Sequence, residues 1–186
     1  RRTMKYFLII STLIITNLFA SRDNPETGWN YDISTLQGFY YFEILTVDGS
    51  PAVGDGGGQA TFCSDNFNAC DVIGAFIEAD DGSELCVGWQ YAKEEGFSEV
   101  PVMGDDGNSF TAGYTTPGEV PTFKVYNASN GSILDITPAG TVDGWANLSF
   151  NNIFGTSTAN NTFGCTDAAA CNYNAGATAD DGSCES

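Results

Sequence analysis

One stretch limits what this chain can fold into more than any other: two apolar runs joined by an acidic turn, at residues 71–92. The first run reads Asp-Val-Ile-Gly-Ala-Phe-Ile and the return run Leu-Cys-Val-Gly-Trp-Gln-Tyr-Ala. Both are apolar at successive positions, which suits a central strand that is covered on both faces. The Ala-Asp-Asp-Gly-Ser turn at 79–83 carries residues that tolerate the left-handed dihedrals of a tight reversal. The stretch therefore predicts the core hairpin of an all-β domain.

Further runs of β-branched and aromatic residues follow at short intervals, with Gly, Asp, Asn and Pro turns between them. The run at 122–126 alternates as a half-buried strand does, and the run at 99–104 contains Pro101, which an edge strand tolerates. No stretch has the apolar spacing of a helix. The chain is therefore predicted to be all-β, an antiparallel β-sandwich with a short disulfide-rich C-terminal appendage. Beyond the hairpin, the expected strands lie at residues 39–47, 59–62, 99–104, 122–126, 133–136 and 145–150.

The sandwich is expected to occupy residues 21–154, between segments of different composition. Residues 1–20 combine a basic start, an apolar run and a small final residue, as in a secretory signal peptide preceded by translated upstream residues. The run is shorter than the roughly 20 apolar residues of a spanning helix, so an uncleaved anchor is the less favoured alternative. No membrane span is expected after its removal. Residues 155–163 are rich in Ser, Thr and Asn and predict a linker to the appendage at 164–186.

The charge of the chain excludes several kinds of partner. It has 6 basic and 24 acidic side chains. Loss of the leader would remove three basic side chains and no acidic one, which leaves a net charge of −21. A surface this negative repels phosphate backbones and anionic membranes, so nucleic-acid binding is not expected. Solubility in a saline or cation-rich exterior explains most of these acids better than cation binding does.

The residue types also argue against an enzyme. The chain has no His, which excludes Ser-His-Asp and Cys-His nucleophilic catalysis and His-ligated metals. Two carboxylates could hydrolyse a glycoside without His, but none stands out as buried beside an aromatic residue. Glu43, inside an apolar strand, is the nearest candidate, and a solvent-facing position explains it more simply. We expect a non-catalytic protein.

Six cysteines in a chain with an export signal indicate disulfides rather than zinc or redox chemistry. Cys63 and Cys70 flank a short polar loop and are the favoured pair. Cys86 is then either a buried free thiol or displaces one partner of that pair. The spacing leaves the connectivity open. The remaining candidates, all in the appendage, are Cys165, Cys171 and Cys184.

Several motifs of the predicted sandwich resemble a β-sandwich module of large secreted bacterial surface proteins. The motifs are DVIGAF, CVGWQYA, VPVMGDD, GYTTPGE and PTFKVYNASNGSILDI, and they span about residues 38–137. That module is an accessory or adhesion-type unit. The resemblance implies a sandwich fold at the cell surface or in the exterior, and it offers no catalytic residue to carry over.

The appendage resembles a short cysteine-rich repeat of secreted bacterial proteins, Gly-Cys-Thr-Asp … Ala-Cys-Asn-Tyr-Asn … Asp-Asp-Gly-Ser-Cys, which is often tandem and often precedes a sorting domain. Here Ala168 and Ala175 replace the usual Pro, and Gly176 replaces the usual Asn. The loop is therefore expected to be less rigid and to have one oxygen ligand fewer. The sequence ends two residues after the last cysteine, and we expect the repeat region to be truncated there.

Oxygen-bearing side chains in the appendage suggest a calcium site. Hard cations take oxygen ligands on loops that contain Gly, although no Glu closes a twelve-residue EF-hand loop here. The alternative is that these residues only form Asx turns in a disulfide knot. The candidate ligands are Asp167, Asn172, Asn174, Asp180 and Asp181. A less favoured second set comprises Asp80, Asp81, Glu84, Asp105 and Asp106.

The expected function is that of a calcium-stabilised adhesion or structural module in an extracellular assembly. Contacts with other surface proteins, or with copies of itself, would form by strand addition at an exposed sheet edge. The alternative is a carbohydrate-binding module, because aromatic side chains on a sandwich face can stack on sugar rings. The candidate stacking residues of this alternative are Trp89, Tyr91 and Trp145, although aromatic residues on strands are more often part of the core.

Overall fold

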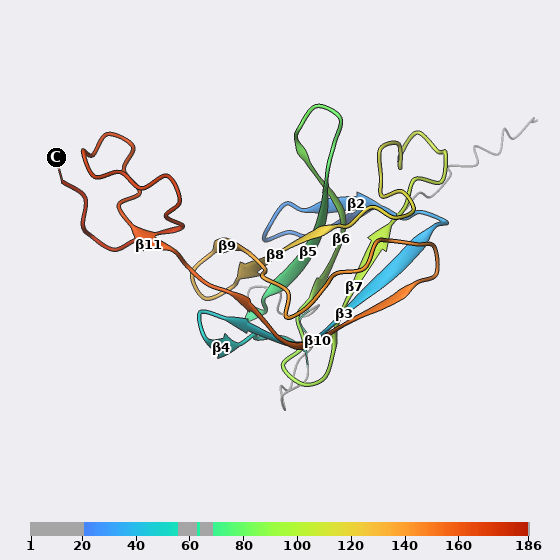
Figure 1. Ribbon diagram of the computed structural model, residues 1–186, viewed down its shortest axis with the longest axis horizontal. Coiled ribbons are helices and arrows are strands. Elements are labelled where there is room, and N and C mark those ends of the chain that lie inside the picture. The colour runs from blue at the N-terminus through green and yellow to red at the C-terminus, as the bar shows by residue number, and fades with distance from the viewer. Residues whose placement is uncertain (1–20, 56–62, 64–68, 186) are drawn as a thin grey trace, which may run out of the picture.

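The computed structural model describes residues 21–55, 63 and 69–185, and in this part of the chain it is an all-β sandwich (Figure 1). Two four-stranded sheets share one apolar core, as the sequence predicts. The expected signal peptide at 1–20 and the expected strand at 59–62 lie outside the described residues. Among the described residues, no helix has the length and apolar character needed to cross a membrane.

The first sheet is built around β3. β7 and β10 both pair with residues 39–42 of β3, so they flank it on opposite sides. β7 and β4 run antiparallel to β3, whereas β10 runs parallel to it, a pairing that the expectation of antiparallel sheets did not include. The strands of this sheet are β3 (Gln37–Val47), β4 (Ser50–Pro51), β7 (Ser98–Met103) and β10 (Phe150–Ala159).

The second sheet contains the hairpin predicted at residues 71–92, and all its pairings are antiparallel. Gly82 adopts a φ of 80° in the turn, where Ala79 N–H donates to Ser83 O at 2.8 Å. The strand order is β6-β5-β8-β9. These strands are β5 (Val72–Glu78), β6 (Glu84–Tyr91), β8 (Thr122–Asn127) and β9 (Ser132–Asp135).

β5 is buried on both faces, as its apolar run predicts. Its inward residues, Ile73, Ala75 and Ile77, join the core between the sheets. There, Phe123 of β8 meets aromatic rings of β3 at centroid distances of 5.0 and 5.2 Å. The other face of β5 lies under Trp29, whose ring packs edge-on against Phe76 at 5.2 Å. Trp29 belongs to the segment that joins β1 (Ser21–Asp23) and β2 (Asn30–Asp32), which pair antiparallel beside β6.

Two close approaches hold β7 in place, one at the side of the sandwich against β6 and one at the end of β7. A Cβ atom on Gly88 would lie 1.7 Å from the Pro101 carbonyl oxygen, so β6 and β7 meet where only Gly fits. At the end, the Trp145 indole N–H donates to Val102 O at 3.0 Å. Gly104 lies against the same indole, because a Cβ atom there would approach the ring to 2.3 Å.

The predicted boundary after residue 154 is wrong. Residues 155–159 were expected to begin a linker, but they continue β10 and pair with residues 44–47 of β3. Their small polar side chains fit a strand because Ser157 is fully buried and its hydroxyl accepts Ala139 N–H at 3.0 Å. The expected strand at 145–150 starts only at Phe150, since the residues before it form an irregular turn around Trp145.

Two disulfides brace the protein and suggest an oxidising, extracellular environment. Cys63 and Cys70 are bonded, which is the pair favoured from the sequence. Cys165 bonds Cys184 across the appendage, which also contains the short parallel pair β11 (Phe163–Gly164) and β12 (Ala179–Asp180). Cys86 is a half-buried free thiol, and Cys171 is free and exposed.

Candidate functional site

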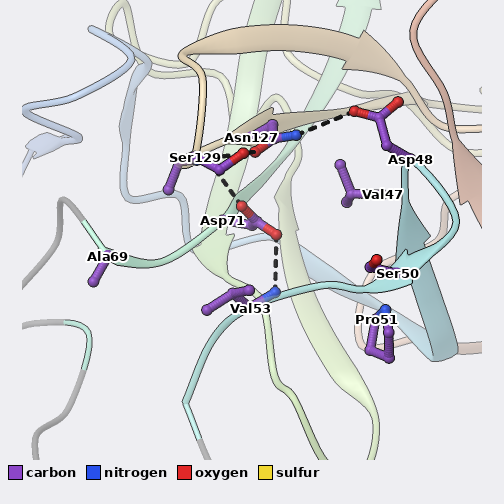
Figure 2. A pocket seen from close by; sticks show the side chains of 10 residues that line it. Val47, Asp48, Ser50, Pro51, Val53, Ala69, Asp71, Asn127 and Ser129 are labelled. Carbon is purple, nitrogen blue, oxygen red and sulfur yellow. Dashed lines mark hydrogen bonds between the residues drawn. The ribbon is translucent and has the colours of Figure 1, made fainter.

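A pocket of about 390 Å³ lies where β4, the start of β5 and the turn after β8 meet (Figure 2). Asp71 is buried beside it, and its two carboxylate oxygens accept the N–H groups of Val53 and Ala128, each at 2.9 Å. Burial raises the pKa of the Asp71 carboxyl, while these two hydrogen bonds lower it. The carboxylate therefore joins three segments of the backbone, and both of its oxygens are already engaged.

The polar wall of the same pocket is also internally bonded. Asn127 Oδ1 accepts the N–H and the hydroxyl of Ser129, and Asn127 Nδ2 lies 3.4 Å from Asp48 Oδ2 (Figure 2). Asp48 also accepts the backbone and side-chain N–H groups of Asn161, at 2.8 and 2.6 Å. These contacts hold the turn between β3 and β4, the turn after β8 and the segment after β10 together. They explain the pocket as a structural junction.

Each of the five candidate calcium ligands of the appendage accepts a hydrogen bond from the backbone of the chain. Four of them accept the N–H of the residue two positions later, at 2.9 to 3.0 Å, which is the Asx-turn arrangement. Asn172 instead accepts Glu185 N–H and donates to Ser183 O. Among the described residues, no group of three or more Cys, Asp or Glu side chains is placed to hold a metal ion. The four Asx-turn residues are Asp167, Asn174, Asp180 and Asp181.

The second acidic set is only partly brought together. Asp80, Asp81 and Asp105 line one cleft of about 680 Å³. Glu84 instead forms an ion pair with Lys124 at 2.8 Å. The remaining residue, Asp106, accepts hydrogen bonds from Thr111, Thr35 and Asn108, and these bonds lower the pKa of its carboxyl well below its usual range.

The three aromatic residues expected for sugar stacking do not form one platform. Trp145 is only 1% exposed and belongs to the core, so its ring offers no face to a ligand; this part of the prediction is wrong. Trp89 and Tyr91 are half-buried on β6 and meet edge to face at 5.6 Å. The Trp89 indole N–H is engaged by Arg22 O at 2.9 Å.

A different group of aromatic residues, some exposed and some half-buried, lies on the outer side of the first sheet. Phe150 stacks beside Phe39 at 5.8 Å and beside Tyr41 at 6.2 Å, while Phe97 meets Phe154 edge to face at 6.2 Å. Phe150 and Phe154 are 65% and 64% exposed. We call these five residues the aromatic face. Sequence reasoning missed it, although the outward position of Phe39 and Tyr41 follows from the alternation of β3 once Tyr40 and Phe42 are in the core.

β10 forms one edge of its sheet (Figure 1). Its aromatic residues form one border of the aromatic face. Phe150, Asn152 and Phe154 are exposed, while Asn151 and Ile153 point inward. A register irregularity follows Ile153, and Gly155, with a φ of 97°, donates its N–H to Glu43 Oε2 at 2.7 Å. Glu43 is thus solvent-facing, as expected, and it secures the bulge of β10.

No protein-family model, curated protein or solved structure matches this chain.

Proposed function

We propose that this chain is a non-catalytic adhesion or structural module of an extracellular assembly. The observation that supports the proposal is the aromatic face, an exposed apolar surface on the outer side of the first sheet. Exposed apolar patches on rigid folds mark interaction surfaces more often than isolated exposed residues do. An open sheet face of this kind suits contact with another macromolecule better than enclosure of a small substrate.

The size of the exposed surface supports a binding role. Phe150 and Phe154 are 65% and 64% exposed, and an aromatic side chain buries about 200 Å², so these two rings leave on the order of 250 Å² of apolar surface in water. Burial of that area would contribute about 6 kcal/mol before the costs of association. Two acidic side chains adjoin the face: Glu43 of β3 and Glu99 of β7, which pairs opposite Tyr41, while β10 carries no charged residue.

The proposal is tested by cell adhesion. The wild-type chain is displayed on cells, and adhesion is compared with that of the double variant Phe150→Lys/Phe154→Lys. The matched control is Phe163→Lys, because Phe163 is also 65% exposed but lies on β11, outside the two sheets of the sandwich. We expect adhesion to be lost in the double variant and kept in the control. Equal adhesion by all three proteins would contradict the proposal.

Glycan binding is the alternative outcome of the same experiment. Binding of the purified chain to polysaccharides that is lost on Trp89→Ala and kept in Phe150→Lys/Phe154→Lys would assign a carbohydrate-binding module instead.

The calcium expectation has its own measurement, a thermal melt with calcium and with chelator. A ligand that binds only the folded state must raise the melting temperature, so an unchanged melt at millimolar calcium would leave the acidic residues as a solvated surface.

A further inference from the structure

The first half of β10, residues 150–154, presents an open sheet edge beside the aromatic face. We infer that this edge pairs antiparallel with the same edge of a second copy of the chain, so that two sandwiches share one continuous sheet. The inference rests on the proposed function and names the partner of that surface.

The backbone of this segment is free to pair. Phe39 N–H donates to Ser149 O at 2.9 Å, so the backbone N–H and C=O groups of Ser149 and Asn151 point toward β3. By the two-residue period of a strand, those of Phe150 and Asn152 point away from it. Among the described residues, the outer side of β10 is bridged only near its end, where Thr158 exchanges two hydrogen bonds with the chain at residue 137. Residues 150–154 therefore form the uncovered part.

Residues 150–154 carry none of the side chains by which natural sheets prevent strand addition. Protected edges carry charged side chains, Pro or β-bulges, or are very short, and the bulge of β10 follows Ile153, at the end of the open segment. The opposite border of the sheet carries Glu99 and Pro101 on β7, and the outer strand of the second sheet, β9, has four residues and ends at Asp135. In contrast, residues 144–166 contain no charged residue and no Pro, in a chain with 30 charged residues. This uncharged edge, in a chain that is otherwise rich in charged residues, is therefore suited to pair with another strand.

A second copy fits this edge because the segment is self-complementary. In an antiparallel pair centred on Asn152, Phe150 of each copy lies opposite Phe154 of the other, and aromatic cross-strand pairs stabilise sheets. The arrangement has two-fold symmetry, the commonest in homo-oligomers. The Gly155 bulge and the bridge at Thr158 end the open segment on one side, which limits the pair to a few residues.

The exposed area predicts a weak dimer. The aromatic rings and the paired backbone would bury on the order of 500 Å² per copy, which is at the lower limit for a specific interface. The copies also repel each other, since each carries a net charge of −18 in the full sequence. Salt screens that repulsion but not the apolar and backbone contacts, so association should strengthen as the ionic strength rises.

The test is analytical ultracentrifugation of the purified chain, over concentrations from about 1 µM to about 1 mM and at ionic strengths of about 0.05 M and about 0.5 M. We expect a reversible dimer that is favoured by salt. Asn152→Lys places like charges at the two-fold axis and should weaken the dimer at least tenfold, on the order of 1.4 kcal/mol. Asn152→Pro removes an outward N–H without touching the β3 ladder and should act likewise.

Ile133→Lys is the matched control, because Ile133 is 45% exposed on the outer strand of the other sheet. This variant should dimerise as the wild type does. A chain that stays monomeric under all conditions, or a dimer that survives both Asn152 variants, overturns the inference. Adhesion that still depends on Phe150 and Phe154 in a monomeric chain would leave the proposed function in place. A dimer that both Asn152 variants disrupt, in a chain that does not adhere, would support the inference alone.

Discussion

Replacement of Asp71 by Ala should destabilise the sandwich more than the replacement of any exposed acid. It removes the acceptor for two N–H groups at 2.9 Å, those of Val53 and Ala128. A hydrogen bond to a charged group contributes about 1.5–3 kcal/mol, and the desolvation that raises the pKa of Asp71 offsets part of the total. We expect the free energy of unfolding to fall by about 3 kcal/mol for Asp71→Ala, and by about half of that for Asp71→Asn, which keeps one acceptor oxygen.

The measurement is denaturant unfolding followed by tryptophan fluorescence, with linear extrapolation to water. Asp135→Ala is the control, because Asp135 is exposed and lies 3.5 Å from Lys124 Nζ; its loss should change stability by less than about 0.5 kcal/mol. A loss below about 1 kcal/mol for Asp71→Ala, a typical value for an ordinary substitution, would refute the reasoning that this carboxylate joins three segments.

The pH dependence of the difference in stability between the wild type and Asp71→Asn checks the environment of Asp71. Burial raises the pKa of this carboxyl above its usual 3.8. A raised pKa in the folded state means that the titration of Asp71 favours folding most below pH 3.8 and that this contribution is lost as the pH rises through the raised value. The wild type should therefore gain stability relative to Asp71→Asn as the pH falls toward 3.8. The opposite trend would contradict a desolvated carboxylate.

Three further substitutions test the packing and the loops. Gly88→Ala should cost about 3 kcal/mol in the same unfolding assay, because its Cβ would lie 1.7 Å from the Pro101 carbonyl oxygen, whereas Gly140→Ala, with open space around it, should cost little. Trp145→Phe should cost about 2 kcal/mol, since it loses volume and the indole N–H that bonds a β7 carbonyl; an unchanged unfolding midpoint would contradict the core position. The lowered pKa of Asp106 means that its contribution is present above pH 3.8 and is lost as the pH falls, so the advantage of wild type over Asp106→Asn in urea titrations should shrink in acid.

The parts of the fold that depend on local pattern were predictable. β5 and its return strand follow from runs that are apolar at successive positions, and the turn between them follows from Asp and Gly. The Cys63–Cys70 bond follows from two cysteines that flank a short loop. Each of these features involves residues near one another in the chain, so their geometry is set mainly by local backbone preferences.

β10 was missed because its composition resembles that of a linker. Ser157 and Asn151 are polar, yet they occupy inward positions of a strand, since β3 supplies the backbone partners and Ala139 supplies a donor for the Ser157 hydroxyl. A strand whose formation depends on a partner more than 100 residues earlier gives only a weak local signal. The aromatic face was therefore not predicted from the sequence, since two of its five residues lie on this strand.

The sequence by itself determined the all-β character, the central hairpin, the acidic surface and the local disulfide, because periodicity, composition and short spacings are properties of neighbouring residues. Only the tertiary structure decided which aromatic rings face water. Trp145 is in the core because Gly38 and Gly104 leave room for its ring, while Phe150 is exposed because no described segment covers that side of the sheet. Exposure depends on which distant segments pack over a side chain, and residue type alone does not specify that.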